Sequence, residues 1–296
     1  MKLLKSISLI LFVFFITAMA HAEQKLVVYT VNYPLQYFAQ QIGGEEVEVH
    51  FPAAADVDPA FWMPDNEALS GYQGADVILL NGAGYARWLN KASLPRLKMV
   101  NTSEGFMDQY ITTELDARHS HGPGGEHSHA GMAFTTWLDF KQALIQAHAV
   151  LKALKQKRPE FSDQFDQNYS VLERQLMDLD RRMRALSLKN PEGILWTSHP
   201  VYQYMARRYQ INVQSVMWEP DKALTKQALD ELKKGLREYP SQYMLWEAEP
   251  LEESVQALRK LELQSLVFNP SANVPRQGDF LSVMQGNVEN LETAFQ

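Results

Sequence analysis

The sequence contains no cysteine, so the chain forms no disulfide and has no cysteine nucleophile. It also lacks the cysteine that carries the lipid anchor of bacterial lipoproteins, and we expect a protein that is free in its compartment. A Gly-x-Ser-x-Gly elbow, a His-Glu-x-x-His helix and a phosphate-cradling loop are absent as well. The loop at 81–84 (NGAG) has two glycines after a strand but no third. These absences argue against an enzyme and against an organic cofactor.

An excess of basic residues is also missing. The chain has 28 Lys and Arg against 35 Asp and Glu, a formal net charge of −7. An acidic surface repels phosphate backbones, and no cluster of Lys and Arg overrides it. The composition therefore predicts no nucleic-acid partner and favours cations as small ligands.

Long hydrophobic runs are limited to the N-terminus. Lys2 and Lys5 precede an apolar run at 7–19 and then Ala20-His21-Ala22, the pattern of a signal peptide cleaved after Ala22. The run is shorter than the roughly 20 residues that span a bilayer, although an uncleaved anchor is the alternative. Export without an anchor indicates the periplasm of a Gram-negative cell.

Short apolar segments alternate with segments of helical spacing in both halves of the chain. The predicted strands are 25–30, 47–51, 76–80, 193–197, 211–217, 244–247 and 265–268. The predicted helices are 35–42, 200–209, 225–236 and 254–260. Strands that alternate with helices predict parallel sheets, with ligand chemistry at the loops past the strand ends.

Helical spacing also runs from Asp139 to about Leu186, with one break at Pro159, and 161–186 is predicted as one long helix; a coiled coil is the alternative. We therefore expect an α/β protein of two lobes, each a mostly parallel sheet flanked by helices, with a ligand cleft between them. The predicted boundaries are an N-terminal lobe at 23–158, a linker helix at 159–188 and a C-terminal lobe at 189–296.

Five segments, in this order, resemble the solute-binding proteins of zinc and manganese ABC importers. They are 29–44 (YTVNYPLQYFAQQIGG), Asp58-Pro59 with Pro64, 75–88 (ADVILLNGAGYARW), Trp137-Leu138-Asp139 and 197–209 (TSHPVYQYMARRY). The resemblance covers essentially the whole mature chain. It implies a periplasmic protein that delivers a divalent cation to an ABC permease in the inner membrane, and we expect a monomer.

In the family this resemblance indicates, three histidines and one acidic residue from four loops clamp the cation. The corresponding positions here are Ala60, Thr135, His199 and Asn269. Alanine offers no donor atom, and neutral oxygens suit Zn²⁺ badly. Only His199 remains, and Glu247 or Glu249 can supply an acid, so the usual site is predicted not to hold zinc tightly.

A histidine-rich loop at 119–129 offers a second set of ligands, His119, His121, His127 and His129. The resemblance places it where zinc-specific members often carry histidines. The glycines between the two His-x-His pairs let the pairs fold toward one ion, and neutral imidazoles bind Zn²⁺, Ni²⁺ or Cu²⁺. A disordered polar loop that binds metal only incidentally is the alternative.

Other residues near the predicted cleft have two interpretations each. Phe61 and Trp62, with Trp137 and Trp246, either line a pocket for an organic ligand or fill the emptied site by packing. His199 is a ligand or only a helix cap.

Two further segments receive a structural interpretation. Glu219 precedes Pro220 and Asp221, where Asp221 can cap a helix, and we interpret Glu219 as structural. Arg207 and Arg208 are expected on a solvated helix face.

Three functions follow as hypotheses. The first is a binding protein that hands a cation, with zinc the first candidate, or an unidentified solute to a permease. The second is a divergent paralogue that binds a non-metal ligand or a partner protein and no longer imports metal. The third, an enzyme, has no motif in its favour.

Overall fold

The computed structural model describes residues 24–55, 57–113, 118–120, 126–128, 131–189 and 191–295, with the backbone alone described at 118–120 and 126–128. The predicted signal peptide and its cleavage site after Ala22 lie outside these residues. Among the helices described, none is both long enough and apolar enough to cross a membrane.

The N-terminal sheet is parallel and has the order β2-β1-β3-β4. Its strands are β1 (Leu26–Thr30), β2 (Val47–His50), β3 (Val77–Leu80) and β4 (Met99–Asn101). Val28 lies in the middle of the sheet, paired with Val49 on one side and Val77 on the other. Helices α1 (Tyr33–Gly43) and α2 (Asn66–Gly74) belong to this unit. The Asn32 side chain accepts from the Leu35 amide and caps α1.

The C-terminal sheet repeats this architecture with the order β10-β9-β11-β12, again all parallel. Its strands are β9 (Ile194–Thr197), β10 (Asn212–Ser215), β11 (Tyr243–Trp246) and β12 (Gln264–Val267). Its helices are α5 (Gln203–Tyr209), α6 (Lys226–Glu238) and α7 (Glu252–Arg259). The two parallel sheets and their flanking helices confirm the predicted α/β architecture.

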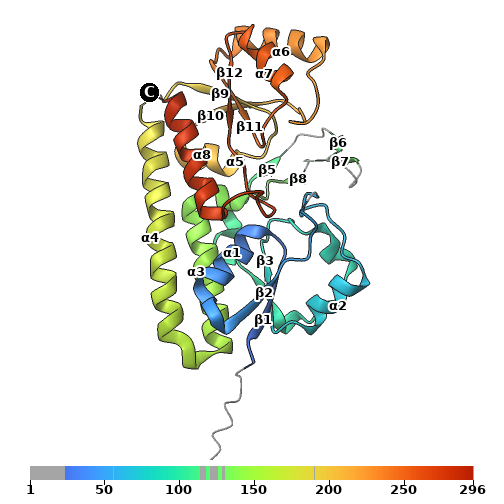
Figure 1. Cartoon of the computed structure of the whole chain (residues 1–296), viewed down its shortest axis with the longest axis vertical. Helices are drawn as coiled ribbons and strands as arrows, with labels where there is room; N and C mark the ends of the chain where they lie inside the picture. The colour runs from blue at the N-terminus through green and yellow to red at the C-terminus, as the bar shows by residue number, and fades with distance from the viewer. Residues whose placement is uncertain are drawn as a thin grey trace, which may run out of the picture.

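A pair of antiparallel helices runs along one side of the molecule, α3 (Phe140–Lys157) and α4 (Ser162–Ser187) (Figure 1). The predicted long helix is confirmed as α4, whose buried stripe includes Leu172, Leu176, Leu179 and Met183. The stripe packs into the main core, so α4 is a packed helix of the fold and not a coiled coil.

The last helix, α8 (Phe280–Ala294), was not predicted; it begins beside α1 and runs back toward the C-terminal sheet, where the Asn290 side chain donates to the Val267 carbonyl at 2.8 Å. Its first residue, Phe280, packs edge-on against Phe38 of α1, with ring centroids 5.4 Å apart. The segment at 189–296 therefore contacts both halves of the molecule.

Two short antiparallel ribbons complete the described chain. β5 (Thr112–Thr113) pairs with β8 (Gly131–Met132), and β6 (Arg118–Ser120) pairs with β7 (Glu126–Ser128). His119 and His127 are opposite each other in the second register. His121 and His129, the other two histidines of the predicted metal-binding loop, lie outside the described residues.

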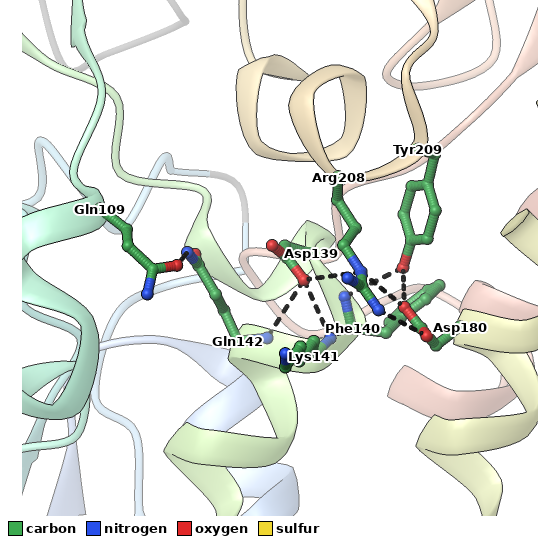
Figure 2. A network of polar contacts seen from close by, with 8 residues as sticks. All are labelled: Gln109, Asp139, Phe140, Lys141, Gln142, Asp180, Arg208 and Tyr209. Carbon is green, nitrogen blue, oxygen red and sulfur yellow. Dashed lines mark hydrogen bonds and ion pairs between the residues drawn. The ribbon is translucent and has the colours of Figure 1, made fainter.

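A polar network ties α3, α4 and α5 together (Figure 2). The Arg208 guanidinium donates to both carboxylate oxygens of Asp180, at 3.0 and 2.8 Å, and lies 3.7 Å from Asp139. The Tyr209 hydroxyl donates to Asp180 at 3.1 Å and accepts from the Phe140 amide. Hydrogen bonding to Asp180 raises the pKa of Arg208. The expectation that Arg208 lies on a solvated face is therefore wrong.

Candidate metal site

Three side chains from separate loops meet at the carboxyl edge of the C-terminal sheet. His199 follows β9, Glu219 follows β10, and Glu247 comes directly after β11. Because β10, β9 and β11 are neighbouring parallel strands, the loops after them open at the same edge. The strand order thus brings together residues that are far apart in the sequence.

The imidazole of His199 lies between the two carboxylates. Its Nδ1 is 3.2 Å from Glu247 Oε1, and its Nε2 is 3.7 Å from Glu219 Oε1. His199 is fully buried, and the side chains of Glu219 and Glu247 are 11% and 20% exposed. Among the residues that the structure describes, these three form the group of metal-ligating side chains whose donor atoms lie within 4.8 Å of one another.

The separation of 3.2 Å between His199 Nδ1 and Glu247 Oε1 fits two ligands of a small cation. Zinc bonds of 2.0–2.2 Å in a tetrahedron place two ligand atoms about 3.4 Å apart. The carboxylates also create a negative potential in a buried place, where charges act more strongly than in water. One nitrogen of His199 and one oxygen from each carboxylate lie within 4.8 Å of one another, so all three side chains can contribute a ligand to one cation.

Two of the other positions that the resemblance assigns to metal ligands, Thr135 and Asn269, lie beside residues 201–202, which follow His199. The Thr135 hydroxyl donates to the Val201 carbonyl, and the Tyr202 hydroxyl donates to the Phe268 carbonyl at 2.8 Å. Ala60 is fully buried. Asn269 Oδ1 accepts from the Ser271 amide at 2.7 Å. Ala60, Thr135 and Asn269 bring neither an imidazole nor a carboxylate.

Aromatic rings pack together beside these loops. Tyr85 lies edge-on to Phe134 and to Trp137, with centroid distances of 5.3 and 5.7 Å, and Phe61 lies edge-on to Phe134 at 6.1 Å. Burial raises the pKa of Tyr85 well above its usual value, and the charge of Asp58 adds to this effect. The rings therefore form a packed apolar wall.

One tryptophan expected in this region lies elsewhere. Trp246 belongs to a separate core cluster of the C-terminal unit, where it packs 6.1 Å from Trp218 and donates to Ser265 Oγ at 3.2 Å. Trp246 lies inside β11, on the face of the sheet that α6 and α7 cover. The expectation that Trp246 lies in the same region as Phe61 was therefore wrong.

The helix-cap interpretations were also wrong. Helix α5 begins at Gln203 with Tyr202 in the capping position, so His199 does not cap it. Thr225, and not Asp221, caps α6 by accepting from the Ala228 amide at 3.1 Å.

Sequence reasoning missed Glu219, which was interpreted as structural. The signal that could have found it is its place just after the predicted strand at 211–217, in a sheet where that strand is next to the one before His199. Glu249, the alternative acid, is exposed and is not part of the group.

Residues 28–294 match the ZnuA family, described as zinc-uptake complex component A, periplasmic. The chain belongs to this family. The match to the ZnuA family confirms the resemblance that the five sequence segments indicated. Among the described residues, it covers both parallel sheets apart from Leu26 and Val27 of β1, and every α-helix from α1 to α8.

Similarity to two metal-binding proteins of streptococci is consistent with this family. The chain is 24% identical over 291 residues to the zinc-binding protein AdcA of Streptococcus pyogenes, covering 91% of this chain and 56% of AdcA. It is 24% identical over 288 residues to the metal ABC transporter substrate-binding lipoprotein FimA of Streptococcus parasanguinis, covering 91% and 89%. The chain thus spans little more than half the length of AdcA.

Solved structures share the fold. The metal-dependent lipoprotein YcdH of Bacillus subtilis superposes with a TM-score of 0.77 at 20% identity, covering 92% of this chain and 99% of YcdH. The Zn(II)-bound ZnuA-like domain of Streptococcus pneumoniae AdcA gives the same TM-score, identity and coverage. Two α/β units joined by a long helix are therefore the ZnuA-family architecture in this chain.

Proposed function

We propose that this protein is the solute-binding component of an ABC importer and carries a divalent cation, with zinc the first candidate, at His199, Glu219 and Glu247. The observation that carries the proposal is the convergence of a buried imidazole and two carboxylates within 4.8 Å at the carboxyl edge of the C-terminal sheet. Zinc accepts imidazole and carboxylate ligands in this number. The names of AdcA and of the Zn(II)-bound AdcA domain support zinc as the cargo.

The proposed site differs from the four-loop clamp that the resemblance implied. All three ligands come from the C-terminal unit, whereas Ala60 and Thr135 on the facing loops offer no suitable donor. Two carboxylates and one histidine without further protein ligands bind a cation less tightly than a closed four-ligand site. We therefore propose modest affinity, suited to delivery rather than to storage.

The histidine-rich loop is a second place for the cation in this proposal. His119 and His127 are opposite each other in the β6–β7 register, which supports a shared ion with His121 and His129. The two sites are separable, because they use different residues.

The proposed setting is the periplasm, after cleavage of the signal peptide behind Ala22, with an inner-membrane ABC permease as the partner and a monomer as the active form. The description of the ZnuA family as periplasmic supports this setting.

A second function has one specific observation in its favour. Phe134 and Thr135 line a small pocket with Pro200 and Val201, just after His199, and buried Phe134 packs edge-on against Phe61, so the N-terminal side of this region is apolar and packed. A divergent paralogue that binds a non-metal ligand or a partner protein would keep such a wall. Recovery of the cognate metal permease on the immobilised protein would count against this second function.

The test is a calorimetric titration of Zn²⁺ into the mature chain and three variants. His199→Gln removes the imidazole ligand, a fourfold His→Ser variant at 119, 121, 127 and 129 removes the loop ligands, and the third variant combines both changes. Glu249→Gln is the matched control, because Glu249 is exposed and outside the group.

We expect two binding events in the parent chain, one in each single-site variant and none in the combination, with Glu249→Gln unchanged. Two events that survive His199→Gln would overturn the proposed site. If the parent chain gives no heat when Zn²⁺ is added, the proposal of metal binding is wrong.

A further inference from the structure

Two hydroxyl side chains end neighbouring strands just before the candidate metal site. Thr197 is the last residue of β9 and Ser215 is the last residue of β10, and the two are paired in the register of the sheet. Thr197 is fully buried, because its strand lies between β10 and β11. Both hydroxyls therefore lie at the edge of the sheet where the loops with the candidate ligands begin.

These hydroxyls form a chain of hydrogen bonds that ends at the backbone of His199. Thr197 Oγ1 donates to the His199 carbonyl at 3.0 Å and lies 2.8 Å from Ser215 Oγ. A hydroxyl has only one proton to donate. Because the proton of Thr197 goes to the carbonyl, Ser215 is the donor in the contact between the two hydroxyls. Each bond in such a chain polarises the next and strengthens it.

The His199 carbonyl accepts a second hydrogen bond, from the Val201 amide at 3.0 Å. That bond closes the turn that follows His199, whereas the bond from Thr197 connects the same carbonyl to the sheet. The carbonyl carbon is bonded to the Cα from which the imidazole projects. Two donors on this carbonyl thus limit the movement of the ligand side chain.

The next residue, Ser198, connects the same segment to the other two proposed ligands. It is fully buried, and its carbonyl accepts from the amide of Trp218, the residue before Glu219, at 2.9 Å. Its hydroxyl accepts from the Glu247 amide at 3.4 Å. The end of β9 therefore contacts the backbone at or next to each of the three proposed ligands.

We propose that Thr197 is a positioning residue of the metal site, an inference that rests on the proposed function of His199, Glu219 and Glu247. The Thr197 hydroxyl, oriented by Ser215, holds the His199 carbonyl in place before the cation binds. Ligands that are already in place lose less conformational entropy on binding. Residues that orient metal ligands in this way typically change metal affinity by about 10–100-fold.

The Zn²⁺ affinity of Thr197 variants tests the proposal, measured by competition with a chelating dye. The fourfold His→Ser variant at 119, 121, 127 and 129 serves as the parent, so that only the site at His199 binds the ion. Thr197→Val keeps the shape of the side chain without its hydroxyl and should weaken Zn²⁺ binding by about tenfold. Thr197→Ser keeps the hydroxyl and should bind within about threefold of the parent.

The matched control is Thr102→Val in the N-terminal unit. Thr102 is also buried, follows a strand of a parallel sheet, and donates to a backbone carbonyl, that of Leu80, at 2.9 Å. Both Thr→Val variants lose a bond of the same kind, so urea denaturation should show losses of stability of similar size. Only Thr197→Val should change the Zn²⁺ affinity, and an equal loss of affinity in both variants would overturn the proposal.

Bound Co²⁺ gives a second measurement, because its visible absorption depends on the arrangement of the ligands. We expect changed bands in Thr197→Val and the bands of the parent in Thr197→Ser and Thr102→Val. If Thr197 only stabilised the fold, Thr197→Val would lower stability and leave the bands unchanged.

The outcomes separate this proposal from the proposed function. If the parent binds Zn²⁺, His199→Gln abolishes binding and Thr197→Val binds as the parent does, only the role of Thr197 is wrong. If the parent binds no Zn²⁺, the site and the role of Thr197 are both wrong. Ser215→Ala, at an exposed residue of the edge strand, should weaken binding by about threefold. If Thr197→Val does not fold, unchanged affinity in Ser215→Ala overturns the proposal.

Discussion

The two sides of the region around His199 differ in what they offer a ligand. On the C-terminal side, the loops after β9, β10 and β11 bring an imidazole and two carboxylates together. On the N-terminal side, the loops carry Ala60, Thr135 and aromatic rings packed edge-on, such as Tyr85 and Phe134. The same fold thus has one wall rich in donors and one wall that is packed. Substitutions on the packed wall should change stability, and substitutions on the other should change cation affinity.

The largest expected effect is on the packed wall. Trp137 is fully buried, and its Nε1 donates to the Pro270 carbonyl at 2.7 Å. Trp137→Ala removes this bond and leaves a cavity, so the free energy of unfolding should fall by about 3–5 kcal/mol. Urea denaturation measures the change. Met63→Ala, at a side chain that is 54% exposed, should change stability by about 0.5 kcal/mol or less, and an equal loss in both variants would contradict a packed wall.

The next effect concerns the two carboxylates. Glu219→Gln and Glu247→Gln keep side-chain size but remove a charge beside His199. Each should weaken Zn²⁺ binding by about 10–100-fold, or about 1.4–2.7 kcal/mol. Competition with a chelating dye measures the affinity. The larger loss identifies the carboxylate that contributes more to binding, and unchanged affinity in both variants would remove these residues from the site.

A smaller effect is expected at the joint between the lobes. Burial raises the pKa of Asp139, and hydrogen bonds from the Gln142 and Lys141 amides and the charge of Arg208 oppose this shift only in part. The folded protein thus holds the Asp139 proton more tightly than the unfolded chain does. The stability that protonated Asp139 contributes is fully present at pH values below the Asp139 pKa of the unfolded chain. It is lost as the pH rises through the Asp139 pKa of the folded protein.

Asparagine does not ionise, so Asp139→Asn removes the loss of stability that accompanies ionisation of Asp139. The asparagine oxygen can still cap α3. The stability of the variant relative to the parent should therefore rise between about pH 4 and pH 7, by about 1 kcal/mol or less. Urea denaturation at several pH values measures it. A relative stability that falls over this range would contradict the sign.

The smallest effect is expected at Asn269. Asn269→Asp is almost isosteric and returns a carboxylate to a position where the resemblance places a ligand. Because the three C-terminal ligands do not use this residue, Zn²⁺ affinity should change by about threefold at most, or about 0.7 kcal/mol. The same dye competition measures it. An increase well above tenfold would show that the loop after β12 also holds the cation.

The sequence by itself determined the elements and the missing ligands. Apolar runs bounded by helical segments predict two parallel sheets and the long helix α4, because periodicity follows from which face is buried. The lack of a donor at Ala60 is likewise a property of the residue type, whatever its surroundings. The five motifs were enough to recognise the ZnuA family, which the match over 28–294 confirms.

Only the tertiary structure decided which residues meet. Glu219 looks like a loop residue before a proline until the order β10-β9-β11 places its loop next to His199. Arg208 looks like a surface residue until α4 brings Asp180 within 2.8 Å of it. Helix α8 reaches α1 only in the folded chain. Strand order and helix packing depend on contacts between distant segments, and local sequence patterns do not encode those contacts.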